Sequence, residues 1–211
     1  MDLENLNKEQ KKAVLYNEGP LLILAGAGSG KTKVLTTKIA YLIKEKNISP
    51  YEILAITFTK KAAKEMKERV ENLIGEEARF IQISTFHSFG LKLLRENCKT
   101  LGYDSNFVIM DSDDSLVIVK KIMKDYDIKQ FSPKAVKNKI SSCKNELMTP
   151  NDYEKYVAGD FDQIILDVYR KYEEKLKSSN AVDFDDLLLL PIKLFRKHKD
   201  ILEMYQNRYK Y

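Results

Sequence analysis

The sequence predicts an α/β protein with a parallel sheet, joined to an all-α region. Over residues 1–108, short apolar runs alternate with segments of helical period, which is typical of βαβ units in a parallel sheet with helices on both faces. From residue 111 to 200 no strand-like run is evident, which predicts the all-α region. The chain of 211 residues is 44% hydrophobic, enough for one or two domains with a sizeable core.

The predicted elements of the first half follow from apolar periodicity. Three short apolar runs predict strands at Pro20–Ala25, Ile53–Phe58 and Phe80–Ser84. Segments with apolar residues three and four positions apart predict helices at Lys31–Lys46, Lys60–Ile74 and Thr85–Leu101.

The predicted helices of the second half begin at recognisable caps. An acidic cap at 111–114 precedes the first, Ser132-Pro133 and Thr149-Pro150 precede two more, and 160–177 has the apolar period of a longer one. We expect this region to be inserted into, or appended to, the α/β part.

Composition excludes several classes of protein. With 8 glycines and 5 prolines, the chain has few of the residues that an all-β protein with many tight turns needs. Its longest apolar runs are too short to cross a membrane, and its N-terminus lacks the apolar core of a secretory signal. Cys98 and Cys143 form no CxxC pair, which disfavours a zinc ribbon or disulfide framework and favours a cytoplasmic location. The net charge of +5 is only a weak argument for nucleic acid.

The most informative motif is the glycine-rich segment between the first predicted strand and helix. It reads Ala25-Gly26-Ala27-Gly28-Ser29-Gly30-Lys31-Thr32 and matches a Walker A phosphate loop, except that Ala25 replaces the first glycine of the pattern. Backbone amides of such a loop bind phosphate, Lys31 can bridge the β- and γ-phosphates, and the Thr32 hydroxyl can bind Mg²⁺. The alternative is a glycine-rich connector followed by a chance Lys-Thr.

A second segment, LNKEQ, lies upstream of the loop. The Gln10 side chain carries a donor and an acceptor side by side and could pair with adenine, which would select ATP over GTP. The alternative is an ordinary capped amphipathic helix.

Three further segments come after predicted strands or the all-α region. Thr57-Phe58-Thr59-Lys60 ends the second predicted strand, where an aromatic ring with hydroxyls and a lysine could stack a base and hold phosphate; a core Phe with a solvated Lys is the alternative. Thr85-Phe86-His87 ends the third, and His87 could be a metal ligand, a base or a backbone anchor. Asp183-Phe184-Asp185-Asp186 resembles a catalytic acidic cluster, although an acidic helix N-terminus is the commoner explanation.

Together, the ordered segments LNKEQ, AGAGSGKT, ILAITFTKKAAKEM, ISTFHSFGLKLLR and VDFDDLL resemble the N-terminal part of superfamily 1A DNA helicases of the UvrD/PcrA/Rep type. The resemblance implies that 1–108 and 181–211 form a first RecA-like, ATP-binding domain, and that 109–180 form a helical insertion lying against duplex DNA. It implies an ATP-dependent 3′→5′ helicase or translocase, active in DNA transactions such as repair, with ATP and Mg²⁺ as cofactors.

The resemblance also assigns residues. It implies that Gln10 recognises adenine and that Gly26 to Thr32 hold the triphosphate and Mg²⁺. Single-stranded DNA contacts fall on Thr57, Phe58, Thr59, Lys60, Thr85, Phe86 and His87, with Lys60 in place of the Asn usual in the family. The implied partners are single-stranded DNA, a single-strand/duplex junction and a C-terminal part of the same helicase, but no membrane.

The resemblance places Tyr211 close to the family's Walker B strand. In the family, this strand with its Asp-Glu pair begins near this position. We therefore expect an incomplete sheet, and we expect the 211 residues alone to bind nucleotide weakly at most and not to hydrolyse it. The alternatives are a stand-alone nucleic-acid or protein-binding module without ATPase chemistry, and a different P-loop enzyme such as a small kinase.

Overall fold

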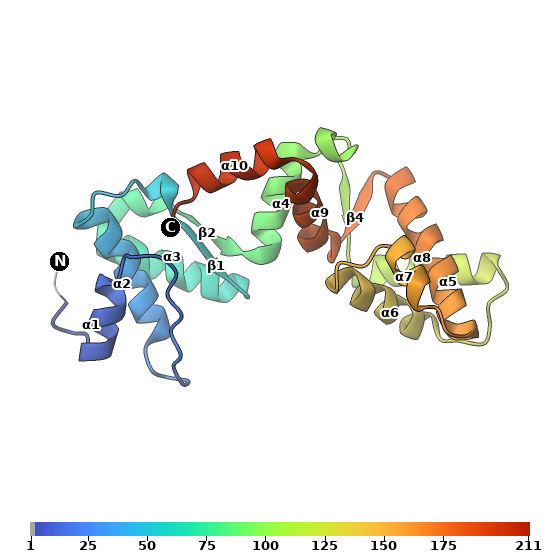
Figure 1. Ribbon diagram of the computed structural model, residues 1–211, viewed down its shortest axis with the longest axis horizontal. Helices are drawn as coiled ribbons and strands as arrows, with labels where there is room; N and C mark the ends of the chain where they lie inside the picture. The colour runs from blue at the N-terminus through green and yellow to red at the C-terminus, as the bar shows by residue number, and fades with distance from the viewer. Residues whose placement is uncertain (1–2) are drawn as a thin grey trace. The chain divides into compact units, whose positions relative to one another are not determined.

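The computed structural model describes residues 3–211, which divide into two compact units (Figure 1). Unit 1 comprises the chain up to Phe86 together with Leu202–Tyr211, and unit 2 comprises His87–Ile201. The division expected from the sequence, into 1–108, 109–180 and 181–211, stays a prediction.

Unit 1 has a small parallel sheet covered by helices. Its elements in chain order are α1 (Lys8–Leu15), α2 (Lys31–Lys44), β1 (Leu54–Thr57), α3 (Lys60–Ile74) and β2 (Gln82–Thr85), with 3-10 turns at Pro50–Glu52 and Gly75–Phe80. Strands β1 and β2 pair in parallel through the α3 crossover, with Thr57 opposite Thr85. The core joins apolar side chains of α2, α3 and both strands, among them Ile39, Ile53 and Val70. The predicted α/β class, the parallel pairing and the α3 range are confirmed.

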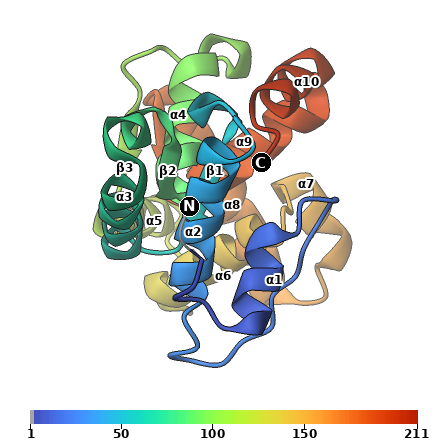
Figure 2. The ribbon, with the colours of Figure 1, turned by 90° about the vertical axis from the view of Figure 1, so that its left-hand side faces the viewer.

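The predicted strand at 20–25 is wrong. This stretch carries no strand, and the side chains of Leu22 and Leu24 are 81% and 87% exposed. Figures 1 and 2 show it as part of the loop between α1 and α2. An apolar run becomes a strand only when a neighbouring strand bonds to its backbone, and the sheet described in unit 1 contains β1 and β2 alone.

The edge of β1 that does not pair with β2 forms hydrogen bonds with the C-terminal residues. The Leu54 amide donates to the Tyr211 carbonyl at 2.8 Å, and the Tyr211 amide donates to the Glu52 carbonyl at 3.1 Å. This alternation is that of a parallel ladder. Beside it lies a cavity of about 380 Å³, lined on one side by Leu21 and Ile23 and on others by apolar residues of α2, α3 and β1.

Unit 2 is mostly helical, with one two-stranded parallel sheet. It contains most of α4 (Phe86–Asn97), then β3 (Val108–Met110), α5 (Ser112–Asp125), α6 (Pro133–Asn145), α7 (Pro150–Tyr153), α8 (Asp160–Ser178), β4 (Ala181–Asp183), α9 (Asp186–Lys197) and the start of α10 (Lys199–Arg208). Short 3-10 turns lie at Lys99–Leu101 and Glu154–Tyr156. Strand β3 precedes the helices α5 to α8, and β4 comes after them and pairs with β3.

The expectation of no strand between 111 and 200 is therefore wrong for β4. A strand of three residues shows too little alternation to be recognised in a sequence, and it forms here because β3 pairs with it. The main core of unit 2 gathers buried side chains of α5, α6 and α8, including Val119, Ile140 and Tyr169. In the part of the chain described, no helix is long and apolar enough to cross a bilayer.

Candidate nucleotide site and nucleic-acid interface

The glycine-rich loop of unit 1 curls directly into the start of α2. Gly28 and Gly30 have φ of +74° and +82°, in the left-handed region that favours glycine. Gly30 is the N-cap of α2 and offers no side chain to its amides. The first amides of a helix have no partner within it, so they and the helix dipole favour an anion at this place.

Lys31 lies against the curl that precedes it. Its ammonium donates to the carbonyls of Ala25 and Gly26 at 2.9 and 2.6 Å, and the Ser29 hydroxyl donates to the Gly26 carbonyl at 2.8 Å. A cation and a set of helix N-terminal amides thus lie together, which fits the charge and shape of a triphosphate.

Thr32 is the one residue predicted from the sequence to bind Mg²⁺. Over residues 3–211, no group of three or more His, Cys, Asp or Glu side chains is arranged to hold a metal ion. The hydroxyl of Thr32 therefore stays a prediction as a ligand of Mg²⁺, and no acidic ligand is assigned.

Gln10 connects α1 to the loop. The Gln10 Oε1 accepts from the Asn7 backbone amide at 3.0 Å, and the Asn7 Oδ1 accepts from the Gln10 backbone amide at 2.9 Å. The Gln10 Nε2 donates to the Ser29 carbonyl at 2.9 Å. The first two bonds form a capping box, which is the simpler alternative for this segment. Adenine recognition by Gln10 stays a prediction, and both polar atoms of the side chain would have to exchange or share their present partners to make it.

The carboxyl ends of β1 and β2 bring two aromatic rings together. Because the strands are parallel and end opposite each other, Phe58 and Phe86 come after them at the same edge, with ring centroids 5.5 Å apart. Phe58 is 89% exposed and Phe86 is 45% exposed. A ring this exposed loses apolar contact with the protein and presents a face on which a base could stack.

The hydroxyls nearby have structural partners. Thr59 caps α3 by accepting from the Ala62 amide at 3.1 Å, and Thr57 donates to the Thr59 carbonyl at 3.1 Å. Thr85 is buried, whereas Lys60 is exposed at the first position of α3. Of the predicted DNA-contact residues of unit 1, Phe58, Thr59, Lys60 and Phe86 are thus the exposed ones, and the Thr59 hydroxyl is engaged as the cap of α3.

In unit 2, His87 lies beside an aromatic ring that sequence reasoning did not single out. The rings of His87 and Phe184 meet edge to face with centroids 6.1 Å apart. Phe184 belongs to the acidic segment 183–186, whose Asp183 and Asp186 are buried.

Sequence reasoning also missed Lys144, the partner of those aspartates. Its ammonium lies 2.8 Å from Asp183 and 2.9 Å from Asp186. The available signal was a lysine on the apolar face of α6, next to Cys143 and one turn from Ile140, in a chain with an acidic segment downstream. Burial alone would lower the pKa of Lys144, but the surrounding carboxylates hold it well above its ordinary value.

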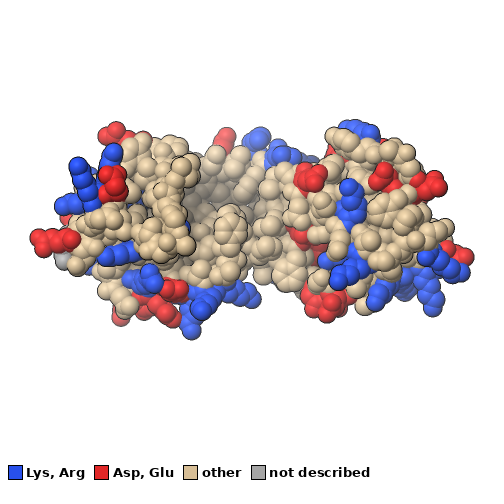
Figure 3. All heavy atoms as spheres, turned by 90° about the horizontal axis from the view of Figure 1, so that it is seen from below, with Lys and Arg blue, Asp and Glu red and all other residues tan. Residues whose placement is uncertain are grey.

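Charge is distributed without a dominant basic surface on the face drawn in Figure 3. There, Lys and Arg are interspersed with Asp and Glu within each unit. The candidate nucleic-acid interface is defined by its exposed aromatic rings, Phe58 and Phe86.

Comparison with known proteins decides the family. A profile described as UvrD/REP helicase N-terminal domain matches residues 6–211. The chain belongs to the UvrD/Rep helicase family. The matched range contains the glycine-rich loop, both aromatic residues Phe58 and Phe86, and the acidic segment 183–186.

Individual UvrD/Rep relatives agree. The chain is 49% identical to the ATP-dependent DNA helicase PcrA of Staphylococcus epidermidis, 48% to that of Bacillus subtilis strain 168 and 47% to that of Staphylococcus aureus. In each case the alignment covers 99% of this chain and 29% of the relative. The chain thus spans less than a third of the length of these curated relatives.

The buried acid Asp186 predicts that the stability of this UvrD/Rep chain depends on pH. Burial raises the pKa of Asp186 to about 7, against the lowering effect of Lys144 and with the help of Asp183 and Glu173. Between its ordinary value of 3.8 and about 7, the folded chain therefore binds a proton that the unfolded chain has released. This contribution to stability is complete below about pH 4 and is lost as the pH rises through 7, with a slope of at most about 1.4 kcal/mol per pH unit.

Asp186→Asn is expected to flatten the fall in the free energy of unfolding between pH 5 and pH 7. Urea unfolding at several pH values measures the slope, and Asp185→Asn in the same turn is the control that should keep it. An Asp186→Asn protein with the parental slope would contradict the assignment.

Proposed function

We propose that the protein to which this chain belongs is an ATP-dependent DNA helicase or translocase that moves 3′→5′ on single-stranded DNA. The observation that carries the proposal is the curled loop before α2, with Lys31 against it. Its support from relatives is the name of the PcrA proteins as ATP-dependent DNA helicases, to which the chain is up to 49% identical.

Each residue of the loop has a role in this proposal. The backbone between Ala25 and Gly30 and the first amides of α2 would hold the phosphates, and Lys31 would neutralise the β- and γ-phosphates. Thr32 would bind Mg²⁺, and Gln10 would contact adenine while bracing the loop through Ser29. ATP, when bound, supplies the phosphoanhydride bond whose cleavage drives movement along DNA.

The finer architecture is also a proposal. We place unit 1 in a RecA-like domain whose sheet is incomplete: the edge of β1 that meets Tyr211 is where a further parallel strand would pair, beside the apolar cavity. The helices α5 to α8 form an inserted subdomain in this proposal, since the chain enters and leaves them through the paired strands β3 and β4. This subdomain would lie against the duplex at a single-strand/duplex junction.

For the 211 residues alone, we propose binding without hydrolysis. In this proposal the chain by itself is a nucleic-acid-binding module without ATPase chemistry. The remaining residues of such a helicase, its location in the cytoplasm and a role in DNA repair belong to the same proposal.

Phe58→Ala is expected to weaken single-stranded DNA binding by roughly 1–3 kcal/mol, the cost of one lost base stack. Fluorescence anisotropy with a labelled oligothymidylate measures the affinity. Because phosphate contacts release counterions, the parental affinity should fall with salt, with a slope of roughly −0.7 per neutralised phosphate.

Tyr51→Ala is the matched control. Tyr51 is 53% exposed and also contacts another aromatic ring, Phe80 at 5.0 Å, but it precedes β1 rather than following it. The control should bind DNA like the parent. Equal affinities of a folded Phe58→Ala protein and the parent would remove Phe58 from the interface, and the absence of salt-dependent DNA binding in the parent would contradict the proposed function of this chain.

A further inference from the structure

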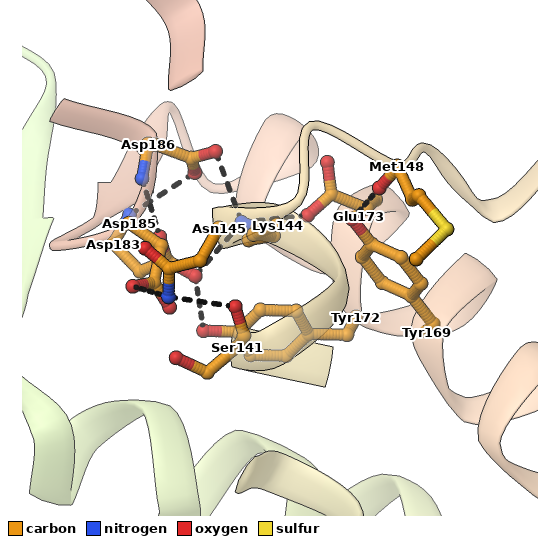
Figure 4. Close-up of polar contacts among 10 residues, drawn as sticks. All are labelled: Ser141, Lys144, Asn145, Met148, Tyr169, Tyr172, Glu173, Asp183, Asp185 and Asp186. Carbon is orange, nitrogen blue, oxygen red and sulfur yellow. Dashed lines mark hydrogen bonds and ion pairs between the residues drawn. The ribbon is translucent and has the colours of Figure 1, made fainter. Parts of the chain in front are cut away.

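A buried ionic cluster lies in unit 2 (Figure 4). Lys144 is 1% exposed, and its ammonium is 2.8 Å from Asp183, 2.9 Å from Asp186 and 2.8 Å from Glu173. The Tyr172 hydroxyl donates to Asp183 at 2.9 Å. We refer to these five residues as the Lys144 cluster.

The cluster joins four elements and braces one turn. Lys144 comes from α6, Tyr172 and Glu173 from α8, Asp183 ends β4 and Asp186 begins α9. Within the turn, the Asp186 amide donates to the Asp183 carboxylate at 2.8 Å and the Asp183 amide donates to the Asp186 carboxylate at 3.2 Å. Each aspartate thus binds the backbone of the other while Lys144 binds both side chains.

Asn145, which follows Lys144 on α6, binds a third acid of the same turn. The Asn145 amide group donates to Asp185 at 3.2 Å, so three acids of the turn have partners on the last turn of α6. The one side chain of 183–186 that α6 does not hold is Phe184, which is 48% exposed and meets His87.

Stability is a poor explanation for such a cluster. Removing charges from water is costly, and a buried ion pair often stabilises a fold no more than well-packed apolar residues of the same volume would. The cluster does fix the backbone before and after Phe184, because the side chains of Asp183 and Asp186 cannot change rotamer without losing their charged partner Lys144.

We propose that Lys144 is a positioning residue: through Asp183 and Asp186 it fixes the turn that holds Phe184 against His87, and so it orients the imidazole of the predicted single-strand contact segment. The proposal rests on the proposed function for the role of His87 in binding DNA. The geometric part, from Lys144 to His87, is independent of that role and can be measured without DNA.

The test reads the imidazole directly. The chain has two histidines, His87 and His198, so their ring protons are resolved by NMR and assigned with His87→Gln. Phe184→Ala defines the shift of the His87 resonance when the aromatic neighbour is removed. Lys144→Met, which keeps the length of the side chain and removes the charge, is expected to move the His87 resonance in the same direction and to leave His198 unchanged.

Two variants separate positioning from general loss of stability. Ile165→Ala removes a fully buried side chain from the same core without touching the cluster, so it should lower the melting temperature but leave the His87 resonance in place. If Lys144→Met does not fold, Asp186→Asn replaces it. This substitution keeps the shape of the side chain but weakens its contact to the Lys144 ammonium and its bond to the Asp183 amide. We expect it to move the His87 resonance in the same direction as Lys144→Met, but by less.

The outcomes distinguish the two proposals. An unmoved His87 resonance in a folded Lys144→Met or Asp186→Asn protein would overturn the positioning role, whatever DNA binding shows. If the resonance moves as expected, oligothymidylate affinity should fall severalfold in Lys144→Met and stay near parental in Ile165→Ala. A moved His87 resonance in Lys144→Met, together with parental DNA affinity in that variant and in Phe58→Ala, would uphold the positioning of His87 and overturn its role in binding DNA.

Discussion

Gly90→Ala is expected to prevent unit 2 from folding stably. Gly90 is buried in α4, where a Cβ would lie 1.9 Å from the carbonyl oxygen of Leu187 and 3.0 Å from its carbonyl carbon. Both atoms are backbone of α9, so no side chain can rotate away and the helices would have to separate. In a helix, alanine is otherwise better than glycine by about 1 kcal/mol, so the substitution is unfavourable here only because of packing.

The expected loss exceeds about 3 kcal/mol, the upper range for one added methyl group in a packed core, because relief requires backbone movement. Thermal and urea unfolding followed by circular dichroism measure it. Gly159→Ala is the matched control: it lies in the same unit at the start of α8, has no atom within 4 Å of its added Cβ, and should cost little. A Gly90→Ala protein as stable as this control would show that α4 and α9 do not approach as described.

Most helices of this chain could be predicted from the sequence because they carry a local signal, whereas α9 and α10 were not among those predicted. The range 60–74 agrees with α3 at both ends, where Thr59 caps the start and Gly75 ends the helix. The acidic cap before α5 and the Ser-Pro and Thr-Pro caps before α6 and α7 likewise mark their first turns. A helix satisfies its own backbone, so residues within it and next to it are sufficient to predict it.

The strands could be predicted less well because pairing decides them. The runs that became β1 and β2 have each other as neighbours, whereas the equally apolar run at 20–25 has no strand beside it. In the opposite direction, β3 and β4 have too few residues to show a period, yet they form because the chain brings them together.

The candidate site shows the same distinction. The glycine-rich loop is continuous in sequence, so its motif located Lys31 at the start of α2. The partnership of Lys144 with Asp183 and Asp186 joins residues about forty positions apart, and no local pattern pairs them. The Asp183–Asp186 segment suggested a catalytic cluster or an acidic helix N-terminus, and it does lie at the start of α9, where the Asp183 carboxylate accepts from the Asp186 amide. The sequence did not show that these two carboxylates are also the buried partners of one ammonium.

Lys31→Ala is expected to lower the affinity for ATP by at least about a hundredfold, while single-stranded DNA binding stays near the parental value. Charge-assisted hydrogen bonds contribute about 1.5–3 kcal/mol each, and the ammonium is predicted to contact two phosphates, so its loss removes about 3 kcal/mol or more. The fold should not depend on it, because Lys31 is exposed and its bonds go only to the loop carbonyls of Ala25 and Gly26. Titration of a fluorescent ATP analogue with Mg²⁺ measures the binding.

Lys33→Ala separates this specific contact from a general loss of positive charge. Lys33 is exposed two residues along the same helix, but its ammonium donates to the Asn5 carbonyl at 2.6 Å, away from the loop. It should therefore retain ATP binding within a few-fold of the parent. If Lys31→Ala and Lys33→Ala bound the nucleotide equally well, the helix N-terminus and not the lysine would be holding the phosphates. If the parental chain itself hydrolysed ATP under stimulation by single-stranded DNA, the proposal that residues 1–211 bind without hydrolysis would be wrong, since the catalytic carboxylate would then have to come from this part of the chain.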